Sequence, residues 1–459
     1  MRRLIYIFII GLLLCSYTWA DGSRYASKSL LSEGKWVKIR VDKTGIYKLS
    51  YADLKNMGFS DPSKVSVHGY GGWPLDEDFS KEYIDDVPST PVWRGSDYLL
   101  FYGKGSVKWE YDSSSQTFVH TNNPYCLYGY YFVTDATPTN DMTSVAQASG
   151  ASTRITTYDD YLLHEQELVS VNQSGREFFG EDFSGARPRT ISTFSSIPGI
   201  TDADGKVTMR FISRINSGSG TASLSINDSE LLDITIPSIQ TVSSNVRSYT
   251  KAIPGTTTAL WKGSKSEKNN VVVSYSSSGH TNVRLDYIRM QFVRTLRPYG
   301  ACTFFRSLTS VGNASRFVIS EANSNTLVFD VTDALNVKRV EADLNGSELS
   351  FTIPAGRLRE FVLVQTNQTF PSPEVASSNL HGLEQRDMII ISAPSLVQQA
   401  ERLAVAHREK DGLTVEVVTP EAIYNEFSSG TPDATAYRRL MKMFYDRSSS
   451  LGNPPKYLL

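Results

Sequence analysis

The sequence predicts a multidomain, mostly β protein that ends in the start of a parallel α/β domain. Three observations support this fold class. A chain of 459 residues is too long for one hydrophobic core. Up to residue 370, short alternating or apolar runs are separated by turns rich in Gly, Ser and Asn, which is typical of β-sandwich-like domains. Residues 387–459 instead follow the pattern β-α-β-α-β and stop inside the third strand, so we expect a truncated domain.

The first 20 residues have the pattern of a secretory signal peptide. Two arginines precede an apolar run over 4–14, and a small-x-small cleavage site ends at Ala20. Cys15 suggests lipidation as an alternative, but Leu14 stands where a lipobox needs a small residue. No later apolar run approaches the roughly 20 residues that span a bilayer. We therefore expect an exported protein without a transmembrane helix.

Residues 21–134 are predicted to form an N-terminal β-rich domain. Residues 36–41 alternate apolar and basic side chains, as a half-buried strand does. The Lys43-Thr44-Gly45 turn predicts that this strand forms a hairpin with 46–49, and a brief helix is expected over 51–57. Further strands are predicted at 65–69, 98–102 and 130–133.

A polar stretch rich in Thr, Ser, Asn, Ala and Gly follows, and it predicts a linker over 135–157. Residues 158–310 are predicted to be a β-sandwich domain, although 158–167 fit either a short helix or an extended arm. We expect a small β domain over 311–370, after which a Pro-Ser-Pro motif begins a hinge over 371–386. The alternating runs that support the sandwich are 207–213, 221–226, 231–236, 271–275 and 283–293.

The α/β domain is predicted over 387–459. Its first strand, 388–391, is wholly apolar, as a strand covered on both faces requires. A helical pattern follows and ends at Gly412, and 413–418 form a β-branched strand. The apolar face of that helix comprises Leu396, Ala400, Leu403, Ala404 and His407.

Two more helices and a strand complete the pattern. Pro420 is predicted to open a short helix, and Asp433 to be the N-cap of the next one. A final strand is expected at 456–459. The apolar residues of the last helix are Tyr437, Leu440, Met441 and Phe444.

Charge and cysteine content exclude some functions. The net charge of −2 and the charged fraction of 20% argue against nucleic acid as the principal partner. Removal of the signal peptide leaves Cys126 and Cys302. A disulfide between them is permitted in an exported protein, but two buried free thiols are favoured. Neither has a CxxC partner or a neighbouring His, so neither predicts a metal site or a nucleophile.

Several motifs imitate binding sites, and for each we favour a structural interpretation. The acidic residues 76–78 and 85–86 suggest calcium binding, but they fit a solvated acidic loop better. Residues 202–205 start like a calcium loop but lack its distal Glu, so we expect a turn. The Gly-rich residues 69–73 lack the Lys-Ser/Thr of a phosphate loop, and His407 fits packing better than catalysis. A set of aromatic residues suggests a sugar-binding platform, but it fits a hydrophobic core better. The set is Trp36, Trp73, Trp93, Tyr98 and Tyr102.

Five strings near the end of the chain resemble the opening of the gingipain-type cysteine peptidase domain, a caspase/gingipain-like α/β fold. They are DMIII at 387–391, AERLA at 400–404, HREKDGL at 407–413, IYNEF at 423–427 and PKYLL at 455–459. Four upstream strings are similar to the sortases of the type IX secretion system, which belong to the same family. They are GKWVKI at 34–39, GIYKL at 45–49, WRGSDY at 93–98 and SGREFFGE at 174–181.

This resemblance implies a cell-surface cysteine endopeptidase of a Gram-negative bacterium, associated with the outer membrane. Such a sortase removes the C-terminal signal domain of secreted cargo and joins the new carboxyl end to anionic lipopolysaccharide. The implied partners are therefore cargo proteins, outer-membrane secretion components and the lipopolysaccharide, with no cofactor, no metal and no nucleic acid. The family's catalytic His and Cys follow later strands of the sheet. No position here matches them, so we expect them beyond Leu459 and expect this chain alone to be inactive.

Two other functions stay open at this point. One is a secreted gingipain-like protease whose front half is an inhibitory or folding-assisting prosegment. The other is a surface module whose β-sandwiches bind carbohydrate or another outer-membrane protein.

Overall fold

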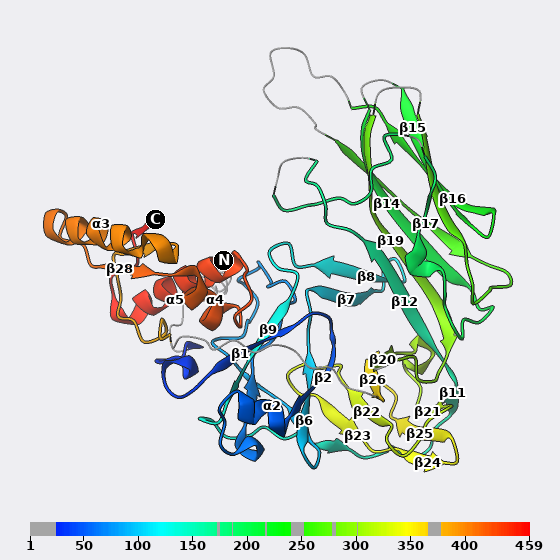
Figure 1. Ribbon diagram of the computed structural model, residues 1–459, viewed down its shortest axis with the longest axis horizontal. Helices are drawn as coiled ribbons and strands as arrows, with labels where there is room; N and C mark the ends of the chain where they lie inside the picture. Colours follow the sequence, from blue (N-terminus) through cyan, green and yellow to red (C-terminus); the bar gives the residue numbers. More distant parts are fainter. Residues whose placement is uncertain are drawn as a thin grey trace, which may run out of the picture.

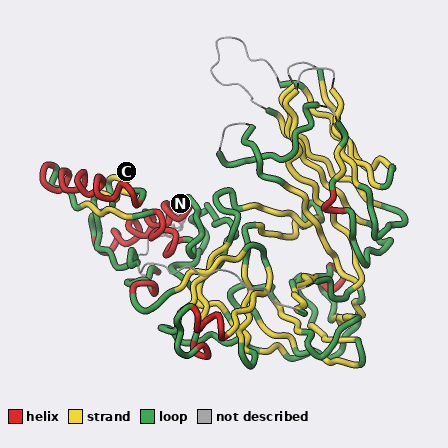
Figure 2. The backbone as a smooth tube through the Cα atoms, viewed as in Figure 1, coloured by secondary structure: helices red, strands yellow, loops and turns green. Residues whose placement is uncertain are grey.

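The computed structural model describes residues 24–171, 175–185, 187–215, 218–239, 252–277, 281–300, 302–365 and 378–459. The predicted signal peptide, Cys15 and the first part of the predicted hinge lie outside these residues. Four units follow one another along the chain, and the sandwich and the helical C-terminal unit stand on opposite sides of the N-terminal unit in Figure 1. Figure 2 shows that the helices concentrate in the C-terminal unit. No helix of the described residues has the length and apolar character needed to cross a membrane.

The N-terminal unit packs two antiparallel sheets, ordered β1-β9-β3-β4 and β2-β6-β5, and adds a separate β7-β8 hairpin. Val37, Ile39 and Val41 point inward from the first strand, while Lys38 and Arg40 alternate outward, so the predicted half-buried strand is present. The elements are β1 (Val37–Val41), β2 (Gly45–Ser50), α2 (Tyr51–Asn56), β3 (Ser66–His68), β4 (Ser89–Thr90), β5 (Val92–Arg94), β6 (Tyr98–Gly103), β7 (Val107–Asp112), β8 (Thr117–Asn122) and β9 (Gly129–Thr134).

The predicted hairpin between the first two strands is wrong. β1 pairs with β9 and β2 pairs with β6, so the two strands belong to different sheets. The turn between them is a corner, where the Tyr47 hydroxyl donates to the Lys43 carbonyl. The inward side chains of both strands meet in one core, which contains Val41 and Leu49 together with Phe101. Burial of two apolar faces against each other therefore outweighs the local preference of the turn for a hairpin.

The segment predicted to be a linker contributes strands to two sheets. β10 (Ser144–Val145) pairs with β23, and β11 (Thr153–Ile155) pairs with β21. Both are the outermost strands of their sheets, where partly exposed polar residues are tolerated, so their composition resembles a loop. The following residues, which fitted a helix or an extended arm, form strand β12 (Thr157–Glu165).

The sandwich consists of the sheets β12-β19-β14-β17 and β13-β18-β15-β16. Alternate residues of both sheets fill one apolar core, which includes Phe211, Leu224 and Val273. The remaining strands are β13 (Arg189–Thr190), β14 (Gly205–Ile215), β15 (Ser219–Ile226), β16 (Ser229–Pro237), β17 (Ile253–Trp261), β18 (Val271–Ser277) and β19 (Thr281–Thr295).

The small β unit has the sheets β10-β23-β22-β26-β20 and β11-β21-β25-β24 around a core of phenylalanine rings. Its strand β20 begins at Cys302, ahead of the predicted boundary at residue 311. A second apolar cluster, with Ile46, Leu100, Phe329 and Val362, joins this unit to the N-terminal unit. Its strands are β20 (Cys302–Phe305), β21 (Ser315–Ile319), β22 (Leu327–Asp330), β23 (Lys338–Val340), β24 (Asp343–Asn345), β25 (Glu348–Ile353) and β26 (Phe361–Val364).

The C-terminal α/β unit is a parallel sheet ordered β28-β27-β29, as the apolar and helical pattern predicts. Helices α4 and α5 bury their apolar residues with Ile389 on one face, and α3 lies against Met388, Ile390 and Val415. The elements are β27 (Met388–Ile391), α3 (Val397–Lys410), β28 (Val415–Val418), α4 (Pro420–Phe427), α5 (Thr435–Leu451) and β29 (Tyr457–Leu458).

Two details of this unit differ from the predictions. Ala434, not Asp433, is the N-cap of α5, although the Asp433 carboxylate still accepts the Thr435 amide at 2.8 Å. The apolar face of α3 is largely uncovered, because three short strands give it little to pack on: Leu403 is 39% exposed and only Ala404 is buried. His407 consequently lies half-buried at the helix end, where Nδ1 contacts Asp411 Oδ2 at 2.6 Å, so the predicted packed histidine is wrong.

Candidate functional site

The carboxyl ends of the parallel strands are where an open α/β sheet normally binds its ligands. Ser392 follows β27 and Thr419 follows β28. Ser392 is buried with its hydroxyl on the Ala393 carbonyl, and Thr419 caps α4. No His or Cys stands at these strand ends in the described part of the chain. The expectation that the catalytic pair lies beyond Leu459 stays a prediction.

The Gly-rich turn at residues 69–73 is where the N-terminal unit receives the α/β unit. The Tyr70 amide donates to Ser429 Oγ at 2.9 Å, and the Thr431 hydroxyl donates to the Gly71 carbonyl at 3.1 Å. Gly69 has a φ of +122°, and a Cβ there would lie 2.3 Å from Ser429 Oγ. Gly69 therefore allows the backbones of the two units to approach closely, and the Gly-rich turn has a structural role.

The start of the chain also crosses to the α/β unit. The Tyr25 hydroxyl donates to Asp446 Oδ2 at 2.8 Å, and the Tyr25 ring joins the core formed by α4 and α5. Arg447 donates to the Ala26 carbonyl at 2.7 Å. The first described residues thus contribute to the packing of a unit that lies about 400 positions later in the sequence.

A buried ion cluster closes this junction. His381 is fully buried, and its ring bridges Glu426 Oε2 on Nδ1 and Asp85 Oδ1 on Nε2, both at 2.7 Å. Glu426 also accepts the amides of Leu380 and His381 at 2.6 and 2.9 Å. We predicted that residues 76–78 and 85–86 lie in solvated acidic loops; residues 76–78 are exposed as expected, but the prediction is wrong for 85–86. The carboxylates face inward because a histidine from the far end of the chain compensates their charge.

Ligand atoms of Asp86, His381 and Glu426 converge within 4.8 Å, so these three residues meet the distance requirement of a metal site. Their carboxylates nevertheless already accept protein donors: Asp86 takes the Ser29 hydroxyl and the Leu30 amide. The imidazolium supplies a positive charge between two carboxylates. We therefore interpret the group as an ion-pair cluster that holds the α/β unit on the N-terminal unit.

The cluster predicts a specific pH dependence of stability. Burial alone would lower the pKa of His381, but hydrogen bonds to Asp85 and Glu426 outweigh it and raise the pKa from 6.5 to about 9. Because the folded-state pKa is raised, this stabilisation is full below pH 6.5 and is lost as the pH rises to about 9. We expect a loss of about 3 kcal/mol over this window. Urea unfolding followed by helical circular dichroism measures it, and a H381Q variant with the same pH slope would contradict this assignment.

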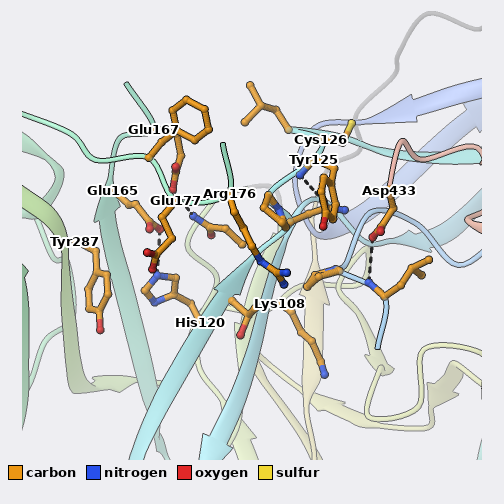
Figure 3. A pocket seen from close by; sticks show the side chains of 18 of the residues that line it. Lys108, His120, Tyr125, Cys126, Glu165, Glu167, Arg176, Glu177, Tyr287 and Asp433 are labelled. Carbon is orange, nitrogen blue, oxygen red and sulfur yellow. Dashed lines mark hydrogen bonds and ion pairs between the residues drawn. The ribbon is translucent and has the colours of Figure 1, made fainter. Parts of the chain in front are cut away.

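A cleft of about 750 Å³ opens where three units meet. Its walls come from the β7-β8 hairpin and the loops beside it, from the sandwich strands β12, β14 and β19, and from the start of α5. In Figure 3, Glu165, Glu167, Glu177 and His120 face the cleft from one side, and Asp433 lies on the other. In the sequence, Asp76, Glu77 and Cys126 are considered separately, and no signal indicates that they lie in one cleft, because its residues share no spacing and come from distant segments.

Charge is unevenly distributed in the cleft. Arg210 pairs with Asp286 Oδ2 and contacts Glu177 Oε1 at 3.4 Å. Asp286 is buried, and burial raises its pKa to about 6 even though Arg210 opposes the shift. Glu165 contacts the His120 ring, with Oε2 3.1 Å from Nε2, and lies beside the Glu167 side chain. Burial of its carboxyl, with the charge of Glu165 beside it, raises the pKa of Glu167 to about 7. The cleft therefore carries more negative charge than its own cations neutralise.

The remaining sequence candidates occupy structural positions. Cys126 and Cys302 are free, as predicted, but they are half-buried and not buried. Burial still raises the pKa of both thiols, which disfavours a thiolate nucleophile. Residues 202–205 form a turn in which Asp202 accepts the Lys265 amide at 2.8 Å. The aromatic residues considered for a sugar platform are buried or half-buried. Trp36, Trp93, Tyr98 and Tyr102 pack in apolar clusters, and the Lys104 ammonium lies over the Trp73 ring, 4.6 Å from its centre.

Comparisons with known proteins give a match for the C-terminal α/β unit and a match for nearly the whole chain. Residues 381–459 match the model of peptidase family C25. The chain is similar to the crystal structure of dimeric latent PorU from Porphyromonas gingivalis, with 35% identity and a TM-score of 0.86 over 95% of this chain and 42% of that one. The chain thus spans less than half the length of PorU. The predicted family resemblance and the predicted fold class are both confirmed.

Other similarities are weak. The insecticidal delta-endotoxin Cry8Ea1 from Bacillus thuringiensis aligns with a TM-score of 0.20 and 11% identity, over 49% of this chain and 41% of that one. That score carries no structural argument. No curated protein sequence matches the chain.

Proposed function

We propose that this chain is the N-terminal portion of a PorU-like cysteine peptidase that acts as a type IX secretion sortase at the cell surface. One observation carries the proposal: a family C25 segment is built onto β-rich units that resemble PorU throughout. In this account the complete enzyme cleaves the C-terminal signal domain from secreted cargo. A thiolate attacks the scissile carbonyl, a histidine moves the proton to the leaving amine, and an amine of anionic lipopolysaccharide resolves the thioester.

The junction between the units favours this function over a removable prosegment. Tyr25, the buried His381 cluster and the turn around Ser429 tie the N-terminal unit to the α/β unit through core packing, ion pairs and backbone hydrogen bonds. Loss of the front half would expose the apolar residues and the charges that these contacts bury. Both units therefore remain in the working enzyme.

Deletion of the gene in the bacterium that encodes it tests the function. We expect secreted cargo to keep its C-terminal signal domain and to lose its attachment to lipopolysaccharide, as measured by mass spectrometry of secreted and surface fractions. Complementation with the intact gene should restore both. Cargo of normal mass in the deletion strain would contradict the sortase function. Cargo that is trimmed but not attached would point to a hydrolytic protease instead.

A further inference from the structure

The cleft between the three units contains an excess of acceptors. Eight of its lining residues are acidic and three are basic. Arg210 pairs with Asp286 and contacts Glu177, Lys108 pairs with Glu110, and Arg176 pairs with Glu77 near the rim. Glu165 and Glu167 remain beside each other with no Lys or Arg partner in the described part of the chain.

Three buried acceptor atoms in this region have no hydrogen-bond partner among the described residues. Two of them are Asn122 Oδ1 and His120 Nδ1; the third, Glu165 Oε2, makes no hydrogen bond but lies 3.1 Å from His120 Nε2 as an ion-pair contact. The His120 side chain is only 5% exposed, and its ring is fixed against Trp109 and Tyr287. Nε2 faces the Glu165 carboxylate, and in a neutral ring that donates through Nε2 the other nitrogen, Nδ1, is an acceptor. Buried acceptors of this kind are unfavourable unless a donor reaches them.

We propose that this cleft binds the ammonium group of a lysine side chain from an extended polypeptide. An ammonium carries three donors and no acceptor, which complements a carboxylate pair and neighbouring orphan acceptors. Two large apolar side chains at the rim, Tyr125 and Leu127, are 39% and 65% exposed and offer a surface for the aliphatic stem of the lysine. Asp433 of the α/β unit lies on the far wall of the cleft.

The ligand atoms in the cleft do not favour a metal ion. Among the described residues, Asp86, His381 and Glu426 are the single group of three His, Cys, Asp or Glu residues whose ligand atoms converge within 4.8 Å. The carboxylates of the cleft do not meet that condition, and hard cations require several convergent oxygens. A flexible side-chain cation fits the dispersed acceptors better. This inference is independent of peptidase activity and goes beyond the proposed sortase function.

Peptide binding to the full-length protein tests the inference. The probe is acetyl-Gly-Ser-Lys-Ser-Gly-amide, and its control is the same peptide with norleucine in place of lysine. Calorimetric titration is expected to show at least tenfold tighter binding of the lysine peptide, with weaker binding at high salt. The E165Q/E167Q variant should lose at least tenfold of this affinity. E384Q, which changes a carboxylate that lies outside the cleft and is 89% exposed, should not alter it.

The comparison of the two peptides on the unaltered protein keeps the test valid if the double variant fails to fold. Equal affinity for lysine and norleucine peptides would overturn the inference, as would full affinity in a folded E165Q/E167Q variant. Titration with calcium chloride provides a further arm. The inference would also be overturned if the unaltered protein bound calcium but not the lysine peptide, and if the E165Q/E167Q variant lost the calcium binding. The cleft would then be a metal site.

Discussion

Replacing Glu426 with Ala is expected to lower the free energy of unfolding of the α/β unit by about 3–5 kcal/mol. The Glu426 side chain is fully buried, and it accepts two backbone amides and the His381 ring. Its removal leaves an imidazolium with one carboxylate partner and two amides without acceptors, all away from water. No rearrangement within the cluster replaces these contacts, because Asp85 and Asp86 already accept other donors.

Helical circular dichroism during urea unfolding measures this loss, because α3, α4 and α5 dominate the helical content of the described residues. The matched control is E421A on the same helix, where the side chain is exposed. It should cost less than about 1 kcal/mol, the value of a carboxylate at a helix N-terminus. Equal stability of E426A and E421A would mean that the buried cluster does not hold the unit in place.

Replacing Arg306 with Met is the second large effect that we expect, again about 3–5 kcal/mol. Arg306 is fully buried where the sandwich meets the small β unit. Its Nε donates to Glu360 Oε2 at 2.6 Å, one terminal nitrogen bonds Glu360 Oε1 as well, and another donates to the Asp159 carbonyl at 2.9 Å. The guanidinium also lies over the Tyr161 ring, 4.4 Å from its centre.

Met fills much of the volume of the Arg306 side chain, so R306M creates little cavity. The loss in free energy of unfolding therefore measures the charge and hydrogen bonds of Arg306. The double variant R306M/E360M should recover most of the stability, because no buried carboxylate is then left unpaired. The control R357M changes an exposed arginine of the same unit and should stay within about 0.5 kcal/mol. Urea unfolding followed by tryptophan fluorescence is suitable, since Trp109 stacks on Tyr161 at 3.9 Å. A double variant less stable than R306M would contradict the ion-pair explanation.

Local periodicity predicted the helices and strands well where the pattern of apolar residues along the sequence matches the buried face of the element. The wholly apolar β27 and the helical spacing of α5 made the parallel α/β unit recognisable, and the alternation in β1 marked its buried face. Pairing partners were harder to predict. The turn after β1 carries the chemistry of a hairpin, but β1 pairs with β9, and its apolar side chains join a core shared with β2 and β6. The edge strands β10 and β11 are polar enough to resemble a linker.

The candidate site was the least predictable part. Asp85 and His381 are separated by 296 positions, so no spacing rule connects the acidic residues with the histidine that compensates them. The same holds for the cleft, where His120 meets Glu165 only because the β7-β8 hairpin folds against the sandwich. Within their own segments, the acidic runs have the composition of solvated loops. Their burial depends on tertiary contacts that a single sequence does not display.

Most centrally, we propose that the β-rich units and the α/β unit stay in one uncleaved chain in the mature enzyme. Intact-mass and N-terminal analysis of the mature protein, isolated from the cells that make it, tests this claim most directly. We expect a single chain that begins at Asp21, after the signal peptide, and continues without a break through residues 366–377 into the α/β unit. A mature protein that begins within or after residues 366–377, with the front half removed, would contradict it.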